Sequence, residues 1–180
     1  MKVVESYAFT KEIAMLAERT NEFGELISVV IEDNCVIYVN MSKQKLLEYN
    51  LKFYGSSFRG AKDGSRAILG NIHMYPISLH AEQGIYLLPS ESANKLECVW
   101  FALHGIYTFY PRNDKTTNVI LTNRMCFEIP VPYKSFSKRY RDAIVLKGMM
   151  EQRTSLMNRL KKKERVQGHP DIPFLQKQID

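Results

Sequence analysis

The sequence predicts an α+β fold: an antiparallel sheet or small barrel, with a basic helix between strands and C-terminal helices. Three observations lead to this prediction. About five to eight short runs of β-branched and aromatic residues are separated by Gly, Pro, Asn and Asp, which is typical of strands and turns. Residues 53–70 instead show the helical spacing of apolar and basic side chains. Helical spacing returns after residue 133 and continues to about residue 165.

A chain of 180 residues, 45% of them hydrophobic, can bury one core. We expect residues 1–133 to form a mixed α/β core, residues 134–165 a C-terminal basic helical region, and residues 166–180 a flexible tail. Residues 1–34 hold three basic and seven acidic side chains, whereas residues 134–165 hold eleven basic and three acidic ones. This distribution, with a net charge of +6, favours an acidic partner: nucleic acid, an anionic membrane or an acidic protein.

The N-terminal third predicts one helical segment and one hairpin. Residues 6–17 are expected to begin extended and turn into a short helix, and Asn21 and Gly24 break that pattern. Residues 26–31 and 35–40 are rich in β-branched side chains and flank a polar turn, which predicts a β-hairpin.

The central prediction is a basic helix at residues 57–69, at the edge of the sheet. Ser42 caps a short helix through residue 49 that leads into it. Ser56 or Ser57 is placed to cap the basic helix, and Gly70 to end it in the left-handed conformation. Its apolar side consists of Phe58, Ala61, Ser65, Ile68 and Leu69, and the basic stripe beside it consists of Arg59, Lys62 and Arg66.

The third side of this helix, formed by Gly60, Gly64 and Ala67, has almost no side chains. Two interior glycines cost about 1 kcal/mol each relative to alanine, which is understandable if a phosphate backbone or a protein segment must approach closely. The alternative is a solvated basic face on an ordinary packed helix. The spacing of Gly55 and Gly60 resembles a phosphate loop, but no Lys follows the second glycine, which argues against nucleotide hydrolysis.

The second half predicts the remaining strands. They are expected at residues 77–79, 84–88, 118–122 and 125–129. Gly105 is expected to be a turn or bulge between two adjacent strands in the aromatic-rich residues 96–110. These aromatics favour core over stacking platforms for single-stranded nucleic acid. Asn123 and Arg124 fit a two-residue hairpin turn.

After Pro132, the helical pattern starts at Ser135 or Ser137 and is interrupted by Gly148. We expect neither a metal nor another cofactor. The three cysteines lie far apart in apolar runs, and no histidine is spaced from them as in a zinc site. No stretch approaches the length of a membrane span, so we expect a soluble cytoplasmic protein without a membrane partner.

The motif CVIYVN at residues 35–40, followed by FYGSSFRGAKDG at residues 53–64, resembles the ComK family of competence transcription factors. That family has a Cys-Val-aromatic-Tyr-Val-Asn strand, then Phe-Gly-Ser-Ser-Tyr and a nearby Gly-Arg-Lys; weaker similarity covers residues 26–150. The resemblance implies a nucleoid-associated activator of competence genes that binds double-stranded AT-rich promoter DNA mainly through the minor groove. It also implies a homo-oligomer that works with RNA polymerase.

This chain departs from the family pattern at several positions. Phe58 replaces the common Tyr, and Ala61 stands where Arg is common, with Arg59 nearby instead. Only Lys62 carries over directly from the family motif. Residues 172–175 are a loose echo of the motif through which some members reach a Clp protease adaptor, so that partner and regulated proteolysis stay open.

The candidate DNA-binding residues are Lys52, Arg59, Lys62, Arg66, Lys138, Arg139 and Arg141. The alternative function is non-sequence-specific binding of RNA or single-stranded DNA. We do not expect an enzyme, because a metal-dependent nuclease needs converging carboxylates and the basic regions lack such a pattern. Docking of the basic tail on anionic membrane is a third reading.

Overall fold

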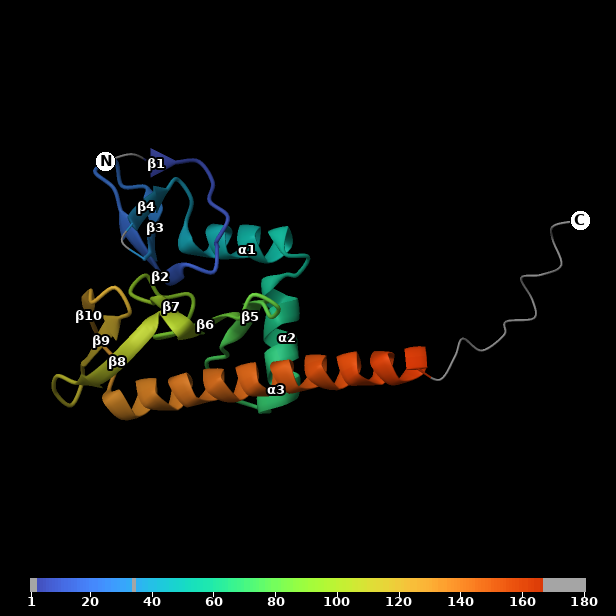
Figure 1. The fold of residues 1–180 in the computed structure, drawn as a ribbon. Helices are drawn as coiled ribbons and strands as arrows, with labels where there is room; N and C mark the ends of the chain where they lie inside the picture. The colour runs from blue at the N-terminus through green and yellow to red at the C-terminus, as the bar shows by residue number, and fades with distance from the viewer. Residues whose placement is uncertain (1–2, 34, 167–180) are drawn as a thin grey trace, which may run out of the picture.

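The computed structural model describes residues 3–33 and 35–166, with side chains up to residue 160. The described chain forms an α+β fold with two sheets and three α-helices (Figure 1). The helices are α1 (Lys43–Phe53), α2 (Phe58–Leu69) and α3 (Tyr133–Val166). The large sheet contains β1 (Val3–Val4), β2 (Ile13–Thr20), β3 (Leu26–Glu32), β4 (Cys35–Val39), β5 (Ile77–His80), β6 (Ile85–Pro89) and β7 (Trp100–Ala102). The small sheet contains β8 (Ile106–Pro111), β9 (Thr117–Leu121) and β10 (Cys126–Ile129).

The large sheet has the order β1-β4-β3-β2-β7-β6-β5, and all its pairs are antiparallel except β1 with β4. The small sheet has the order β10-β9-β8. The predicted α+β class is therefore confirmed, and the barrel alternative is wrong, because the large sheet is open with β1 and β5 at its edges. The predicted hairpin at residues 26–40 is confirmed as β3 and β4.

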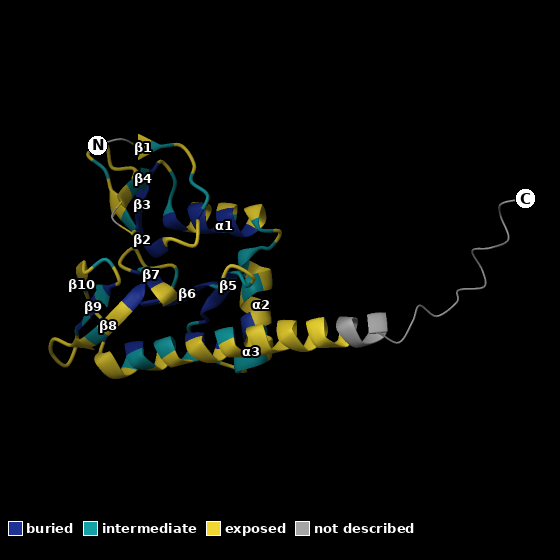
Figure 2. Ribbon diagram, in the orientation of Figure 1, coloured by how far each residue is buried: buried dark blue, intermediate teal, exposed yellow. Residues whose placement is uncertain are grey.

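Both faces of the large sheet are covered. In β6, Ile85 and Leu87 belong to a core cluster with α1, whereas Tyr86 and Leu88 belong to a second cluster with α3 and the small sheet. Side chains of a strand alternate between the two faces, so a strand buried on both sides reads as a continuous apolar run. The buried strands and the exposed outer half of α3 are visible in Figure 2.

The predicted helix within residues 6–17 is wrong, because the segment forms β2. Its run Ile13-Ala14-Met15-Leu16 is buried on both faces of the sheet. A buried apolar run of this length cannot be assigned to helix or strand by periodicity alone. Asn21 and Gly24, which were expected to break a helix, form the turn to β3, where the Asn21 side chain accepts from the Glu25 backbone N–H at 2.8 Å.

The two strands expected within residues 96–110 do not pair with each other. A short 3-10 turn, η1 (Leu103–Gly105), passes the chain from β7 in the large sheet to β8 in the small one. A Cβ atom at Gly105 would lie 2.6 Å from the Ala14 Cα, so only glycine fits where this turn crosses β2. The tight crossing explains why the turn separates the sheets instead of forming a hairpin.

The remaining differences concern lengths. The first helix extends to Phe53 rather than residue 49. The hairpin of β9 and β10 is confirmed, but its loop has three residues, ending at Arg124 with φ of 71°. The C-terminal region is one helix that begins at Tyr133 and continues through Gly148. The tail expected at residues 166–180 lies outside the described residues from 167 onward.

Candidate nucleic-acid interface

Helix α2 begins and ends where the sequence predicts. Ser57 is the N-cap, and its Oγ accepts from the Gly60 backbone N–H at 3.1 Å. The carboxylate of Glu48, on α1, accepts from the Phe58 backbone N–H at 2.9 Å, so α1 also satisfies the start of α2. Gly70 ends the helix with φ of 70°, as glycine allows, but its ψ of −154° differs from the predicted left-handed helical conformation.

The predicted apolar side of α2 is confirmed. Phe58 and Ala61 pack on the core cluster shared with α1, and Ile68 and Leu69 pack on the cluster shared with α3. Ser65 is buried between them, and its Oγ donates to the Pro76 carbonyl at 2.6 Å. The helix contacts edge strand β5, so it is fixed with one side inward and the other toward solvent.

The outward side carries the basic stripe of Arg59, Lys62 and Arg66, and all three residues are exposed. Arg59 lies 3.9 Å from Asp63, but its side chain is 94% exposed, so this pair holds it weakly. The Lys62 Nζ lies 5.8 Å from the centre of the Tyr75 ring. The stripe is therefore available to a polyanion.

The small-residue side of α2 is also open. Gly60, Gly64 and Ala67 are exposed, and a Cβ atom at Gly64 would meet no atom of the described chain within 4 Å. A Cβ atom at Gly60 would meet only the Ser57 and Ser56 hydroxyls within that distance. The close approach expected from these glycines is thus not made by another described segment of this chain.

The other candidate residues differ in their surroundings. Lys52 is exposed at the end of α1, 3.8 Å from Glu48, and Arg141 is exposed on α3. Lys138 is exposed and ion-paired with Asp142 at 2.8 Å. Arg139 is half-buried, and its guanidinium donates to the Ser90 carbonyl. Burial lowers the pKa of Arg139, so this side chain has a structural contact that the sequence pattern did not reveal.

The structure brings the α2 stripe and the start of α3 to two sides of one loop. Residues 71–75 connect α2 to β5. A hollow of about 150 Å³ on one side of the loop is lined by Lys62, and a hollow of about 300 Å³ on the other side is lined by Lys138 and Arg139. His73 and Met74 line both hollows. Sequence spacing gave no signal for this arrangement, because α3 reaches the loop only through the tertiary fold.

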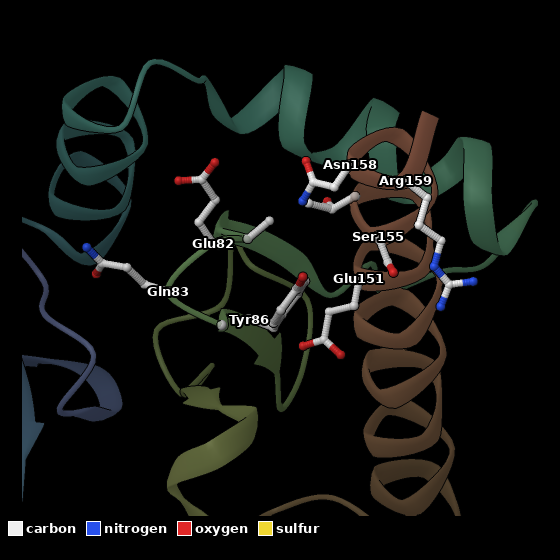
Figure 3. Close-up of a pocket in the computed structure, with 10 residues that line it drawn as sticks. Glu82, Gln83, Tyr86, Glu151, Ser155, Asn158 and Arg159 are labelled. Atoms are coloured by element: carbon white, nitrogen blue, oxygen red, sulfur yellow. The ribbon is translucent and has the colours of Figure 1, made fainter. Parts of the chain in front are cut away.

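A further cavity of about 660 Å³ lies between α3 and the β5–β6 turn (Figure 3). Glu82 and Glu151 line it together with Arg159. Tyr86 lies at its inner wall, where burial, with a smaller contribution from Glu151, raises the pKa of the phenol. The two carboxylates disfavour phosphate, so this cavity is not a part of the candidate interface.

Neither a metal centre nor a membrane span is found in the described part of the chain. His, Cys, Asp and Glu side chains there do not gather in threes that could hold a metal ion. No described helix combines the length and apolar character needed to cross a membrane.

The comparisons with known proteins agree with the motifs on β4 and α2. The model of the family described as ComK protein matches residues 4–155. The chain belongs to the ComK family. It is 32% identical to the competence transcription factor of Bacillus subtilis (strain 168) over 132 residues, which cover 73% of this chain and 68% of that protein. No solved structure shows a significant match.

The ComK match confirms the resemblance and covers every candidate residue. It runs from β1 through α2 and ends within α3, so Lys52, the α2 stripe and the start of α3 all lie inside it. The expected stacking platforms are largely absorbed by the core: Trp100 and Phe101 are buried, and Phe109 packs edge-on against Phe136 at 5.1 Å between ring centres.

Proposed function

We propose that this protein is a sequence-specific DNA-binding transcriptional activator of competence genes. We propose that it recognises AT-rich promoter boxes mainly through the minor groove. The exposed basic stripe on α2, beside a surface almost without side chains, is the observation that carries the proposal. Narrow minor grooves of A-tracts concentrate negative potential and attract such cations. The name of the B. subtilis relative supports the same role.

The residues of the stripe divide into two roles. Arg59 is the proposed groove residue, because its side chain is almost fully exposed and a guanidinium sheds water more readily than an ammonium. Lys62 is the proposed phosphate residue, since it lies back against Tyr75. Arg66, Lys52, Lys138 and Arg141 extend the positive surface. Arg139 is the weakest of the candidates because its guanidinium already bonds Ser90.

We propose a homo-oligomer assembled through the outer half of α3. Figure 1 shows this half extending past α2, away from the sheets. Its exposed apolar side chains include Leu156 at 57%, Met157 at 54% and Leu160 at 49% exposure. The inner half is different, because Phe136, Ala143 and Leu146 are buried in the core. Removing residues 134–165 would therefore damage the core, whereas changing the outer half tests assembly alone.

The remaining partners follow from the proposed role. An activator must engage RNA polymerase, and we place the protein in the cytoplasm at the nucleoid. A Clp protease adaptor would act through residues 172–175, which lie outside the described residues.

The second candidate function is non-sequence-specific binding of RNA or single-stranded DNA. Tyr107 and Tyr110 on β8 are 58% and 45% exposed, and exposed aromatic rings can stack with bases. Against this, the Arg124 guanidinium already lies 4.1 Å from the centre of the Tyr107 ring.

Fluorescence anisotropy with the full chain separates these functions. The probes are an AT-rich duplex, a mixed-sequence duplex, a single-stranded DNA and an RNA of the same length; sedimentation with anionic vesicles tests the membrane reading. We expect the AT-rich duplex to bind tightest, by about a thousandfold over non-specific duplex if a full operator is used. Equal binding of all four nucleic acids supports the second function, and binding of vesicles without a preference for AT-rich duplex contradicts the proposal.

A further inference from the structure

The loop at residues 71–75 is held rigidly by its own tyrosine. Tyr75 is 9% exposed, and its hydroxyl accepts from the Ile72 backbone N–H at 3.2 Å and donates to the Gly70 carbonyl at 3.1 Å. The next residue, Pro76, accepts from the buried Ser65 on α2. The loop is thus fixed to α2 at both ends. A loop held in this way loses little conformational entropy when it binds a partner.

The tip of this loop presents side chains suited to a minor groove. His73 is exposed, whereas Ile72 and Met74 on either side of it are half-buried. The narrow minor groove of A-tracts attracts His as well as Arg and Lys, and Ile and Met are among the apolar wedges that minor-groove proteins insert between base steps. The chemistry of the tip therefore matches the proposed mode of reading.

The charges around the tip are placed for the two phosphate strands. Lys62 lines the hollow on one side of residues 72–74, and Lys138 lines the hollow on the other. The carboxylates in these hollows are already ion-paired, Asp142 with Lys138 and Glu91 with Lys95. A phosphate approaching either hollow meets a cation, and the loop lies between the two.

We propose that residues 71–75 form a second DNA-recognition element, in which His73 enters the minor groove while Lys62 and Lys138 contact the phosphates beside it. This inference rests on the proposed function and adds to it an element outside α2. In this arrangement α2 and the start of α3 supply the flanks of one continuous surface, and the loop supplies its centre.

Two substitutions test the loop by different routes. His73→Ala removes the tip. Tyr75→Phe removes the hydroxyl that holds the loop but no group that faces DNA. Gln83→Ala is the matched control, because Gln83 is exposed in the turn at the opposite end of β5. Lys62→Ala reports separately on the proposed function. Binding is measured by anisotropy with a duplex carrying A-tracts and a duplex of equal length in which G·C pairs interrupt them.

We expect His73→Ala to lower affinity for the A-tract duplex about tenfold, the lower range for a lost base-edge contact, and affinity for the interrupted duplex about twofold or less. Tyr75→Phe should reduce the preference in the same direction by about threefold, which is less than a full base contact. Gln83→Ala should bind like the wild type. Thermal melting of each variant checks that the fold persists.

The outcomes separate the inference from the function it rests on. If both loop variants bind the two duplexes like the wild type while Lys62→Ala flattens the salt dependence, the loop inference is overturned and the proposed function stands. An equal loss on both duplexes for His73→Ala overturns groove entry, because a phosphate contact carries no sequence preference. If the wild type itself does not prefer A-tracts, the proposed function fails and the inference fails with it.

Discussion

Replacing the α2 stripe should change the salt dependence of DNA binding by a countable amount. Each phosphate contact that is lost should flatten the slope of log affinity against log salt by about 0.9. Between about 50 and 200 mM salt, one contact therefore accounts for a factor of about three in affinity. Lys62→Ala should reduce the slope by about 1 and weaken AT-rich and mixed duplexes equally. Arg59→Ala should instead erode the preference for AT-rich duplex by about 1–3 kcal/mol, by analogy with base contacts.

The structure limits what these substitutions can do to the fold. Arg59, Lys62 and Arg66 are exposed, and surface substitutions usually change stability by less than about 0.5 kcal/mol. Only Lys62 has a ring contact, 5.8 Å from the Tyr75 centre, worth about 0.5–1 kcal/mol at an exposed site. The assay is a salt titration of anisotropy for each single variant and for the triple Ala variant, with exposed Lys115→Ala as the control. A folded triple variant with unchanged affinity and slope would show that α2 is scaffold.

Three further predictions concern positions around this surface. Gly64→Ala should stabilise the fold by up to about 1 kcal/mol, because the added methyl meets no described atom, yet weaken DNA binding; unchanged DNA affinity would mean that DNA does not approach this side. Lys43→Met should cost about 2–4 kcal/mol in urea unfolding, since the buried Nζ donates to three backbone carbonyls, including that of Cys98 at 2.6 Å. A loss below about 0.5 kcal/mol would contradict that role. Leu156→Ser with Leu160→Ser should lower the mass seen in sedimentation without loss of helix, and an unchanged oligomer would place assembly elsewhere.

Local signals in the sequence were sufficient to predict α2 and the hairpins. Ser57 and Gly70 mark the ends of α2 through backbone chemistry that acts within a few residues, and the helical period identifies its buried side. The pair β3 and β4 likewise follows from β-branched runs around a polar turn. These elements depend little on the rest of the fold.

The features that the sequence did not predict depend on distant contacts. The run at Ile13 to Leu16 is a strand because sheet and helices cover it on both sides, which no local period reports. Gly105 separates two sheets because it crosses β2 next to Ala14. The structural contact of Arg139 with Ser90 and the position of His73 between two basic hollows both arise from where α3 lies.

The most direct test of minor-groove recognition is competition with a minor-groove ligand specific for AT tracts. Footprinting of an AT-rich promoter box with the full chain gives the protected region without the ligand, and titration of the ligand follows its loss. We predict that ligand occupying the groove displaces the protein in proportion to groove occupancy, whereas chemical modification confined to major-groove base edges leaves binding intact. Protection that persists when the minor groove is filled, and is lost when the major-groove edges are modified, would contradict the account.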